Sequence, residues 1–327
     1  MISSRVRLAR NFSFLNFPPK LTDYDEALSI VKGLYEVLSS YGEFDFYKMK
    51  NIQNLKSLIL LEENLISKEL LENKDISSVA ISEKDNLSVM INEEDHIREQ
   101  CVLGGFNLQE AYERVDALDD ILLENFSISY DENFGFLTTS PTNLGTGMRA
   151  SVMLFLPALT MMGKIDSLSV SANKLGLIVR GKFGENSSGE GYMYQISNEQ
   201  CLGFNEEQII QNVINVTVKI CEMEEEFLGQ IMREKGDEII DLVKRAYGTL
   251  KHAHMISANE SVKLLSQLKI GVNLGIIKLK NKKIIDELII KSQPAHLMEL
   301  SAKDLDPKQR DIYRAEYISK ILIEENR

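Results

Sequence analysis

Hydrophobic residues recur at helical spacing over two early stretches of the chain and again over its C-terminal part. Residues 24–41 place apolar side chains three or four apart: Leu28, Val31, Leu34, Tyr35 and Leu38. This spacing gives a helix one apolar face. Residues 108–125 repeat the pattern and predict a second amphipathic helix. From Asn205 onward, helical periodicity dominates to the end of the chain.

Shorter apolar segments between the early helices predict strands. The segment "SVAISEKDNLSVMI" (78–91) predicts a hairpin, because two apolar runs flank a polar turn. "SLSVSA" (167–172) and "LGLIVR" (175–180) predict a pair of strands, and "GYMYQIS" (191–197) predicts a third. The longer run "RASVMLFLPALTMMG" (149–163) instead predicts a buried helix, with its internal proline as a kink.

The order of these elements predicts the fold class. Strands and helices are mixed as far as about Asn205, and helices alone follow, which indicates an α+β domain and then a helical domain. We expect the boundary near Lys235–Gly236, with a helix that could continue across it. The predicted domains are therefore an α+β domain over residues 1–235 and a helical domain over residues 236–327.

Composition narrows the class of protein. The 327 residues carry a net charge of −12 and are 44% hydrophobic, which allows a sizeable core and argues against a nucleic-acid or anionic-membrane surface. No apolar run approaches the ~20 residues of a membrane span, and the N-terminus lacks the apolar core of a signal peptide. The three cysteines are isolated, without a CxxC pair, so we expect a reducing cytoplasm and no metal site.

Five arginines adjoin segments that the pattern predicts to be buried: Arg5, Arg7, Arg98, Arg149 and Arg180. In "SSRVRLARN" the first two alternate with Val6 and Leu8, so a strand would point both guanidiniums to one side. An unpaired cation is costly near a core. Any one of these arginines is most simply a structural ion pair, but five of them favour one shared anion.

A polyphosphate is a suitable anion for these five arginines, because a guanidinium group binds an oxyanion through bidentate hydrogen bonds. The stretch "NLGTGMRASVM" places Gly145 and Gly147 just before Arg149, at the predicted start of a helix. A cation there opposes the helix dipole, so we interpret Arg149 as tolerated because an anion lies between it and the helix end. The sequence has no P-loop pattern.

Two carboxylate segments accompany the arginines. "NEEDH" places Glu93, Glu94 and Asp95 after a predicted strand, and the glycine-rich "RGKFGENSSGEG" contains Glu185. Taken alone, the first is most simply a solvated acidic turn and the second a surface hairpin, although a mobile lid is plausible. Carboxylates beside a bound triphosphate make sense if a guanidinium substrate lies between them. They would align its nitrogen with the γ-phosphorus, and one could take its proton.

The segments "SSRVRLAR", "NEEDHIR", "SPTNLGTGMR" and "RGKFGE" occur in the order found in the phosphagen (ATP:guanido) kinases. The chain resembles most closely the bacterial protein arginine kinases of the McsB type. The resemblance implies a phosphagen-kinase-like catalytic domain, in which helices flank an antiparallel sheet. It also implies ATP as substrate, with Mg²⁺ carried mainly on phosphate oxygens and water.

The resemblance also implies the residue roles. The nucleotide-binding arginines of the family fall on Arg5, Arg7, Arg98, Arg149 and Arg180. Its catalytic glutamate falls on Glu94 and its lid glutamate on Glu185, with Glu93 and Ser140 as neighbours of the substrate. Ser140 stands where the family usually has cysteine, which removes a thiolate from the site. The chain begins almost on its first motif, which suggests a truncated or misannotated start.

"RDIYRAE" near the C-terminus matches a phosphoarginine-binding motif of the protein arginine kinases. In that role Arg310 and Arg314 would hold the phosphoryl group, and Asp311 would hold the guanidino nitrogens. Taken alone, the stretch is an ordinary amphipathic surface helix in which Asp311 could pair with Arg314 three residues on. Small-molecule guanidino kinases lack this helical extension.

The resulting hypothesis is an ATP-dependent protein arginine kinase in the cytoplasm. The resemblance implies a homodimer and phosphoarginine as an activating ligand. It also implies a zinc-binding activator protein, a stress-gene repressor and a Clp-type protease as partners, with no nucleic acid and no membrane. Two alternatives stay open: a small-molecule guanidino (arginine) kinase, and a non-catalytic adaptor that binds phosphoarginine.

Overall fold

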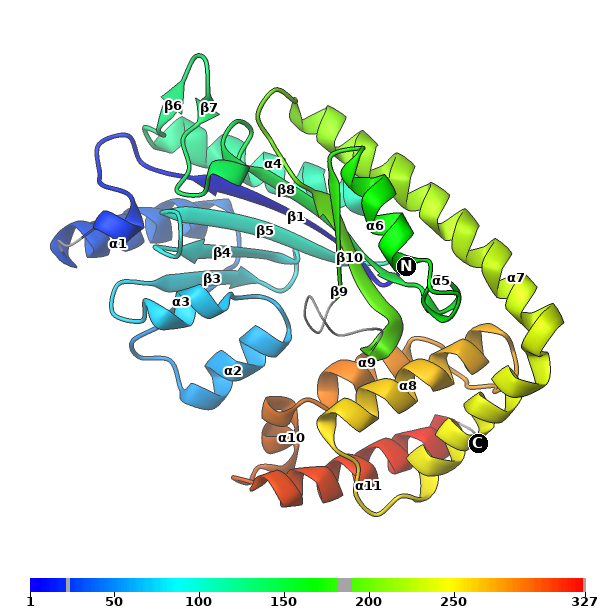
Figure 1. Ribbon diagram of the computed structural model, residues 1–327. Coiled ribbons are helices and arrows are strands. Elements are labelled where there is room, and N and C mark those ends of the chain that lie inside the picture. The colour runs from blue at the N-terminus through cyan, green and yellow to red at the C-terminus, as the bar shows by residue number, and fades with distance from the viewer. Residues whose placement is uncertain (22–23, 182–189, 326–327) are drawn as a thin grey trace. The chain divides into compact units, whose positions relative to one another are not determined.

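The computed structural model describes residues 1–21, 24–181 and 190–325 of the chain (Figure 1). Two compact units are present. The first comprises residues 1–154, 167–179 and 195–219, and the second comprises residues 155–166, 180–194 and 220–327. Within the described ranges, no helix is both long enough and apolar enough to cross a membrane.

A sheet forms the centre of the first unit. Among the described residues it has eight strands in the order β2-β3-β4-β5-β1-β8-β10-β9. The strands are β1 (Ser3–Arg10), β2 (Asp45–Lys48), β3 (Ser78–Ser82), β4 (Leu87–Ile91), β5 (Ile97–Gly104), β8 (Met148–Phe155), β9 (Leu177–Gly181) and β10 (Met193–Asn198). β1 pairs antiparallel with β5 on one side and β8 on the other. The predicted hairpin over 78–91 is confirmed as β3 and β4, which pair antiparallel.

Helices and a small hairpin complete the first unit. They are η1 (Pro18–Lys20), α1 (Tyr24–Tyr41), α2 (Asn54–Glu62), α3 (Lys68–Glu72), α4 (Leu108–Asn125), the β6–β7 hairpin (Tyr130–Asp131 and Gly135–Phe136), η2 (Pro141–Asn143) and α6 (Ile165–Asn173). α4 packs on β1 and β5 because Ala111, Val115, Leu118 and Leu122 form one buried stripe. Both helices predicted from periodicity, over 24–41 and 108–125, are confirmed.

The predicted helix over 149–163 is wrong for its first half. Residues Met148–Phe155 form strand β8, and a short helix, α5 (Pro157–Met161), follows. A continuous apolar run fits a buried strand as well as a buried helix, and pairing of β8 with β1 decides the outcome. Pro157 lies at the first turn of α5, where its missing N–H has no helical partner to lose.

The predicted strand over 167–172 is also wrong, because these residues belong to helix α6. Leu168 and Ala172 lie four apart and are its buried residues, so the helical spacing of the segment prevails over its serine and valine content. The strands predicted over 175–180 and 191–197 are confirmed as β9 and β10. They neighbour each other in the sheet.

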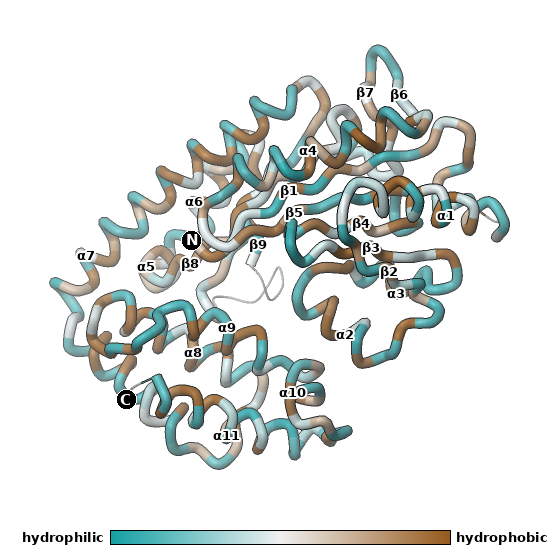
Figure 2. Tube along the Cα trace, turned by 180° about the vertical axis from the view of Figure 1, so that it is seen from behind, coloured by the Kyte–Doolittle hydropathy of each residue, from teal (hydrophilic) through white to brown (hydrophobic). Residues whose placement is uncertain are grey.

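The second unit is mainly helical. It contains α5, the short turn η3 (Glu190–Tyr192), most of α7 (Glu206–His252), α8 (Ala258–Asn273), α9 (Ile284–Lys291), α10 (Pro294–Ser301) and α11 (Pro307–Glu325). α7 alternates hydrophobic and hydrophilic residues along its length (Figure 2). It loses helical geometry at Lys235 (φ −137°, ψ 32°), so a helix does cross residues 235–236, with a kink there. A division into domains at that point stays a prediction.

Two contacts show how the sequence stabilises the second unit. A Cβ atom at Gly271 of α8 would lie 2.1 Å from the Val243 side chain of α7, so glycine permits the close approach of these helices. Glu224 of α7 is buried and accepts the backbone N–H groups of Ala158 (2.7 Å) and Leu159 (2.9 Å) at the start of α5. Burial raises the pKa of Glu224 to about 7.

Candidate active site

Four of the five arginines singled out in the sequence lie on one face of the sheet. Directly opposed residues of antiparallel strands share a face, and residues two apart on a strand share it too. Arg7 on β1 lies opposite Arg149 on β8, and Ala9 lies opposite Arg98 on β5. Arg5, Arg7, Arg98 and Arg149 therefore form what we call the arginine face, within the first unit.

The charges of the arginine face act on one another. Burial, followed by the charges of Arg98 and Arg149, lowers the pKa of Arg5 to about 10. The pKa of Arg7 falls well below its usual value, first through burial and then through its three arginine neighbours, although Glu93 opposes the shift. Within the described ranges, Nε of Arg7 has no hydrogen-bond partner. Such a surface has more positive than negative charge and suits an anion with several oxygens.

The structure changes the explanation for Arg149. This residue lies on strand β8 and not at a helix start, so no helix dipole opposes it. Its Nη2 donates to Oγ of Ser197 at 3.2 Å. The glycines before it have positive φ angles, and a Cβ at Gly147 would lie 2.6 Å from the carbonyl oxygen of Ala9. Gly147 thus allows close packing of the chain against β1.

The loop between β4 and β5 is not a solvated acidic turn. Glu93 is only 1% exposed, and Nη1 of Arg98 lies 2.6 Å from each of its carboxylate oxygens. Ser67 donates from Oγ to the same carboxylate at 2.5 Å. Burial alone would raise the pKa of Glu93, but the charge of Arg98 and these hydrogen bonds prevail and lower it. Glu93 stays ionised and holds Arg98 in place.

Glu94 has a different environment from its neighbour. It is half-buried, and its backbone N–H donates to Oε2 of Glu93 at 3.1 Å. Burial, followed by the charge of Asp95, raises its pKa, and Arg98 only partly offsets the shift. A carboxylate with a raised pKa is a better proton acceptor. The two glutamates therefore differ in chemistry: Glu93 is an ionised anchor for Arg98, and Glu94 is a candidate base.

Asp95 holds this loop against the segment that contains Ser140, and His96 holds it against the residues that follow β1. Asp95 is buried and accepts the side-chain amide of Asn11 (2.6 Å) and the backbone N–H of Thr139 (2.8 Å). Nδ1 of His96 accepts the N–H of Phe12 at 3.2 Å. Burial lowers the pKa of His96 to about 4, so this histidine is neutral at pH 7.

Ser140 directly precedes the turn η2. Its Oγ lies 2.9 Å from Oγ1 of Thr142, and its carbonyl oxygen accepts the Thr138 hydroxyl at 2.9 Å. Because Asp95 binds the adjacent Thr139, Ser140 is linked to the loop that carries Glu94. Its position beside a substrate stays a prediction.

Two further candidates of the catalytic domain are not among the residues that the first unit brings together. Arg180 is exposed at the end of β9 and belongs to the second unit. Glu185 lies outside the described residues. The structure therefore brings together four arginines and the Glu93–Asp95 loop. The roles of all these residues stay predictions.

The "RDIYRAE" stretch lies on α11 of the second unit, and its second arginine is buried. Arg314 is 1% exposed, and its guanidinium donates to the carbonyl oxygens of Ser292 and Ile256 at 2.8 Å each. It also donates to Oδ1 of Asp311 at 2.5 Å, so the predicted pairing is confirmed. Arg310 is half-buried and donates to the carbonyl oxygen of Leu305 at 2.8 Å.

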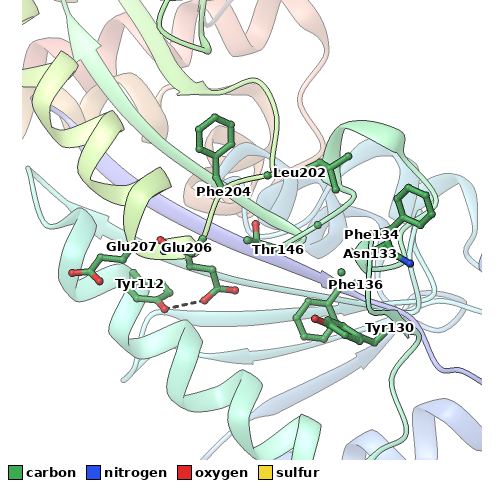
Figure 3. Close-up of a pocket in the computed structure, with 14 residues that line it drawn as sticks. Tyr112, Tyr130, Asn133, Phe134, Phe136, Thr146, Leu202, Phe204, Glu206 and Glu207 are labelled. Atoms are coloured by element: carbon green, nitrogen blue, oxygen red, sulfur yellow. Dashed lines mark hydrogen bonds between the residues drawn. The ribbon is translucent and has the colours of Figure 1, made fainter.

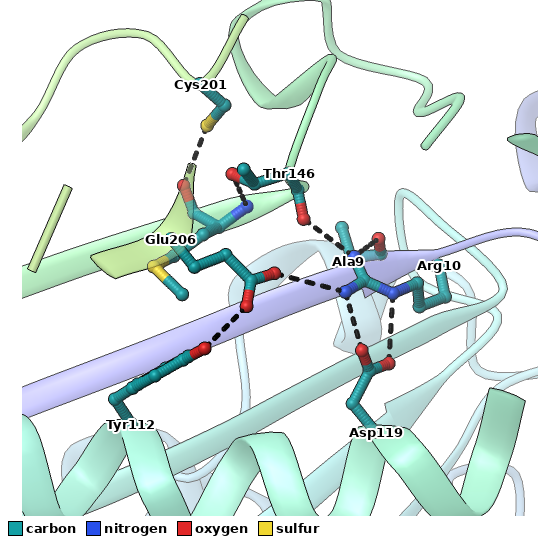
Figure 4. A network of polar contacts seen from close by, with 8 residues as sticks. Ala9, Arg10, Tyr112, Asp119, Thr146, Cys201 and Glu206 are labelled. Atoms are coloured by element: carbon teal, nitrogen blue, oxygen red, sulfur yellow. Dashed lines mark hydrogen bonds and ion pairs between the residues drawn. The ribbon is translucent and has the colours of Figure 1, made fainter. Parts of the chain in front are cut away.

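Arg10, the last residue of β1, was not among the candidates expected from the sequence. Its Nε and Nη2 bind the two carboxylate oxygens of Asp119 on α4 at 2.9 and 2.6 Å (Figure 4). Its guanidinium carbon lies 3.6 Å from the ring centroid of Phe136. Arg10 shares strand parity with Val6 and Leu8, so it faces away from the arginine face. This parity, visible in "SSRVRLAR", marked it as a buried arginine that required a partner.

Comparison with known proteins identifies the family. The model of the C-terminal catalytic domain of ATP:guanido phosphotransferases matches residues 27–227, and that of the protein-arginine kinase McsB C-terminal domain matches residues 236–327. The protein-arginine kinase of Bacillus subtilis is 39% identical over 323 residues, which cover 97% of this chain and 88% of the relative. That of Halothermothrix orenii is 38% identical over 320 residues, 97% of this chain and 91% of the relative.

This chain belongs to the protein-arginine kinase family. The family is a branch of the ATP:guanido phosphotransferases, as the resemblance of its motifs predicted. The protein-arginine kinase of Clostridium tetani is a further relative, 39% identical over 98% of this chain and 95% of its own length.

Solved structures show the fold of the family. Lombricine kinase aligns with a TM-score of 0.61 and 23% identity, covering 68% of this chain and 66% of its own. A duplicated taurocyamine kinase from Schistosoma mansoni, with bound transition-state analog components, aligns with a TM-score of 0.63 and 22% identity, covering 80% of this chain and 38% of its own. The predicted fold class, a phosphagen-kinase-like sheet with flanking helices and a helical C-terminal part, is confirmed.

Proposed function

We propose that this protein transfers the γ-phosphoryl group of Mg·ATP to arginine side chains of other proteins. The observation that carries the proposal is the arginine face beside the loop of Glu93, Glu94 and Asp95. Membership of the protein-arginine kinase family supports the choice of protein arginine as substrate.

The arginine face would bind the nucleotide phosphates. Arg5, Arg7, Arg98 and Arg149 repel one another and are partly removed from water. A triphosphate would relieve that repulsion, and bidentate contacts with its oxygens would fix its direction. Arg180 would add a fifth contact. Mg²⁺ would enter with the nucleotide as part of the substrate, held mainly by phosphate oxygens and water.

Glu94 would orient the substrate guanidinium and accept its proton. One guanidinium nitrogen forms a bond to the γ-phosphorus while the bond from that phosphorus to the ADP oxygen breaks. The nitrogen loses a proton to the carboxylate of Glu94, whose raised pKa suits this task. Alignment and charge stabilisation supply most of the rate in phosphoryl transfer. Glu93 would act through Arg98, and Glu185 would bind the other side of the guanidinium.

The second unit would regulate the enzyme. In this proposal Arg310, Asp311 and Arg314 bind phosphoarginine as an activating ligand. The buried Arg314 is already paired with Asp311, so the ligand would share these groups or displace one of them. The same proposal includes a homodimer in the cytoplasm. It also includes a zinc-binding activator and a stress-gene repressor as partners, and delivery of marked proteins to a Clp-type protease.

Mass spectrometry under non-acidic conditions tests the proposal directly. The protein would be incubated with Mg·ATP and either casein or free arginine, and arginine-linked phosphate would be measured in each. We expect phosphate on casein arginines. Phosphorylation of free arginine alone would favour a small-molecule guanidino kinase. Tight phosphoarginine binding without any transfer would favour a non-catalytic adaptor, in which Ser140 replaces the usual cysteine.

A further inference from the structure

A concave surface lies on the opposite side of the sheet from the arginine face. It is a cavity of about 520 Å³, lined by α4, by the β6–β7 hairpin and by residues 202–207 (Figure 3). All of these segments belong to the first unit. We call it the hairpin pocket. Arg10, whose side chain points away from the arginine face, reaches its floor at Phe136.

The rim of the hairpin pocket is aromatic and exposed. Tyr130, Phe134 and Phe204 are 60%, 51% and 53% exposed. Large apolar side chains gathered on one surface commonly mark a binding site. Tyr130 also packs edge-on against Phe136, with ring centroids 5.3 Å apart, so part of the rim has a fixed geometry.

The charged residues among the described lining of the pocket are acidic. Glu206 and Glu207 line it, and none of its described lining residues is a lysine or arginine. Glu206 accepts the Tyr112 hydroxyl at 2.9 Å and lies 3.7 Å from Nη2 of Arg10. Glu207 is exposed, so its carboxylate is accessible to a ligand. Aromatic faces combined with carboxylates attract cations, and a planar guanidinium can both stack and pair.

The floor of the pocket already contains this arrangement. The guanidinium of Arg10 stacks 3.6 Å from the centroid of Phe136 and approaches the carboxylate of Glu206 (Figure 4). Farther out, Tyr130, Phe134, Phe204 and the exposed Glu207 line the same pocket, with Glu207 on the side of Tyr112 and with Tyr130 and Phe134 on the other side (Figure 3). Charge complementarity therefore selects a cationic occupant, and ring stacking selects guanidinium over ammonium.

We propose that the hairpin pocket is a docking site for an arginine-bearing segment of another protein chain. This site goes beyond the proposed function, because it lies on the other face of the sheet and requires no phosphoryl transfer. An arginine held there would keep a protein partner attached while a different arginine reaches Glu94.

Peptide binding tests the proposal. The probe is a fluorescein-labelled peptide with four arginines separated by glycine and serine, measured by fluorescence anisotropy without nucleotide. Lysine and citrulline versions of the peptide serve as comparisons. The protein variants are Glu207→Lys, Phe204→Ser and the charge-matched control Glu36→Lys, an exposed residue of α1 that does not line the pocket.

Each pocket variant should weaken binding of the arginine peptide about fivefold, the size expected for an exposed stacking contact or ion pair. Glu36→Lys should leave binding unchanged, and the citrulline peptide should bind poorly to every form. Equal binding by Glu207→Lys and Glu36→Lys would overturn the proposal. Equal binding of the citrulline peptide would show an apolar groove, and equal binding of the lysine peptide would remove the guanidinium preference.

This experiment is independent of catalysis. If arginine phosphorylation were absent while the pocket variants still lost peptide binding, the proposed function would fail and the docking site would stand. If phosphorylation occurred and the variants bound like the parent protein, only the docking site would fail. Circular dichroism of each variant would show that the fold is retained.

Discussion

Arg7 and Arg149 are directly opposed across the β1–β8 pair, so two guanidiniums leave the same face of the sheet side by side. Strand pairing that brings like charges together costs free energy unless a third group compensates. The buried Glu93 compensates through Arg98, and it opposes the pKa shift of Arg7. The guanidiniums of the arginine face still repel one another, and a bound anionic ligand would reduce this repulsion.

Replacing Arg149 with alanine should weaken ATP binding by about 10- to 100-fold, the range for loss of a charge-assisted hydrogen bond. The free protein should not lose stability to the same extent, because the change also removes repulsion from Arg5 and Arg7. Titration calorimetry would measure ATP binding, and thermal unfolding would measure stability. Arg245→Ala, at an exposed ion pair of α7, is the control. Unaltered ATP affinity in Arg149→Ala would remove this residue from the phosphate site.

Glu94→Gln should abolish phosphoryl transfer and leave ATP binding close to that of the parent protein. The amide keeps the size of the side chain but cannot take a proton from the substrate. Phosphoarginine formation and nucleotide affinity would be measured on the same preparation. Glu72→Gln, an exposed acid of α3 that is not among the charges raising the pKa of Glu94, provides the control. Transfer that continues at the parental rate would show that the proton goes elsewhere.

Glu224 should make stability fall as pH rises from about 4.5 to about 7. Its pKa is raised by burial from 4.5 to about 7 in the folded protein. The folded state therefore binds more protons than the unfolded state across this window, and stability is greatest below it. Glu224→Gln cannot titrate and should flatten this part of the profile. Urea unfolding at several pH values would measure the slope, with the exposed Glu226→Gln as control. Identical slopes in the parent and Glu224→Gln would contradict this assignment.

Asp311→Ala should reduce activation by phosphoarginine without loss of ATP binding. The change removes the carboxylate that pairs with the buried Arg314, so some loss of thermal stability is also expected. Kinase activity would be measured with and without added phosphoarginine. Glu316→Ala, at an exposed position on the same helix, controls for the loss of a negative charge. If activation were as strong in Asp311→Ala as in Glu316→Ala, the stretch would have only a structural role.

Local pattern was sufficient for the elements with clear periodicity. The helices over 24–41 and 108–125 and the hairpin over 78–91 follow from the spacing of apolar residues. The local pattern was insufficient for β8. An unbroken apolar run has no period, and only pairing with β1 distinguishes a strand from a helix there. The segment 167–172 was misassigned for a related reason, since a short stretch of mixed residues fits both periods.

The candidate site divides in the same way. Alternation along one strand already placed Arg5 and Arg7 on one side. The contact of Glu93 with Ser67 and the pairing of Arg10 with Asp119 could not be predicted, because they join segments far apart in the sequence. The sequence alone favoured a solvated turn at Glu93–Asp95, because it does not show which distant residues contact these carboxylates.

The sequence by itself determined the family, the residue types of the site and the side of β1 on which Arg5 and Arg7 lie. These properties are carried by motifs and by a period of two residues, and both are local. Only the tertiary structure decided that Arg149 lies beside Arg7, that Glu93 is a buried anchor, and that acidic and aromatic residues meet in the hairpin pocket. These outcomes depend on the register between distant strands and on the burial that packing imposes, which no local period specifies.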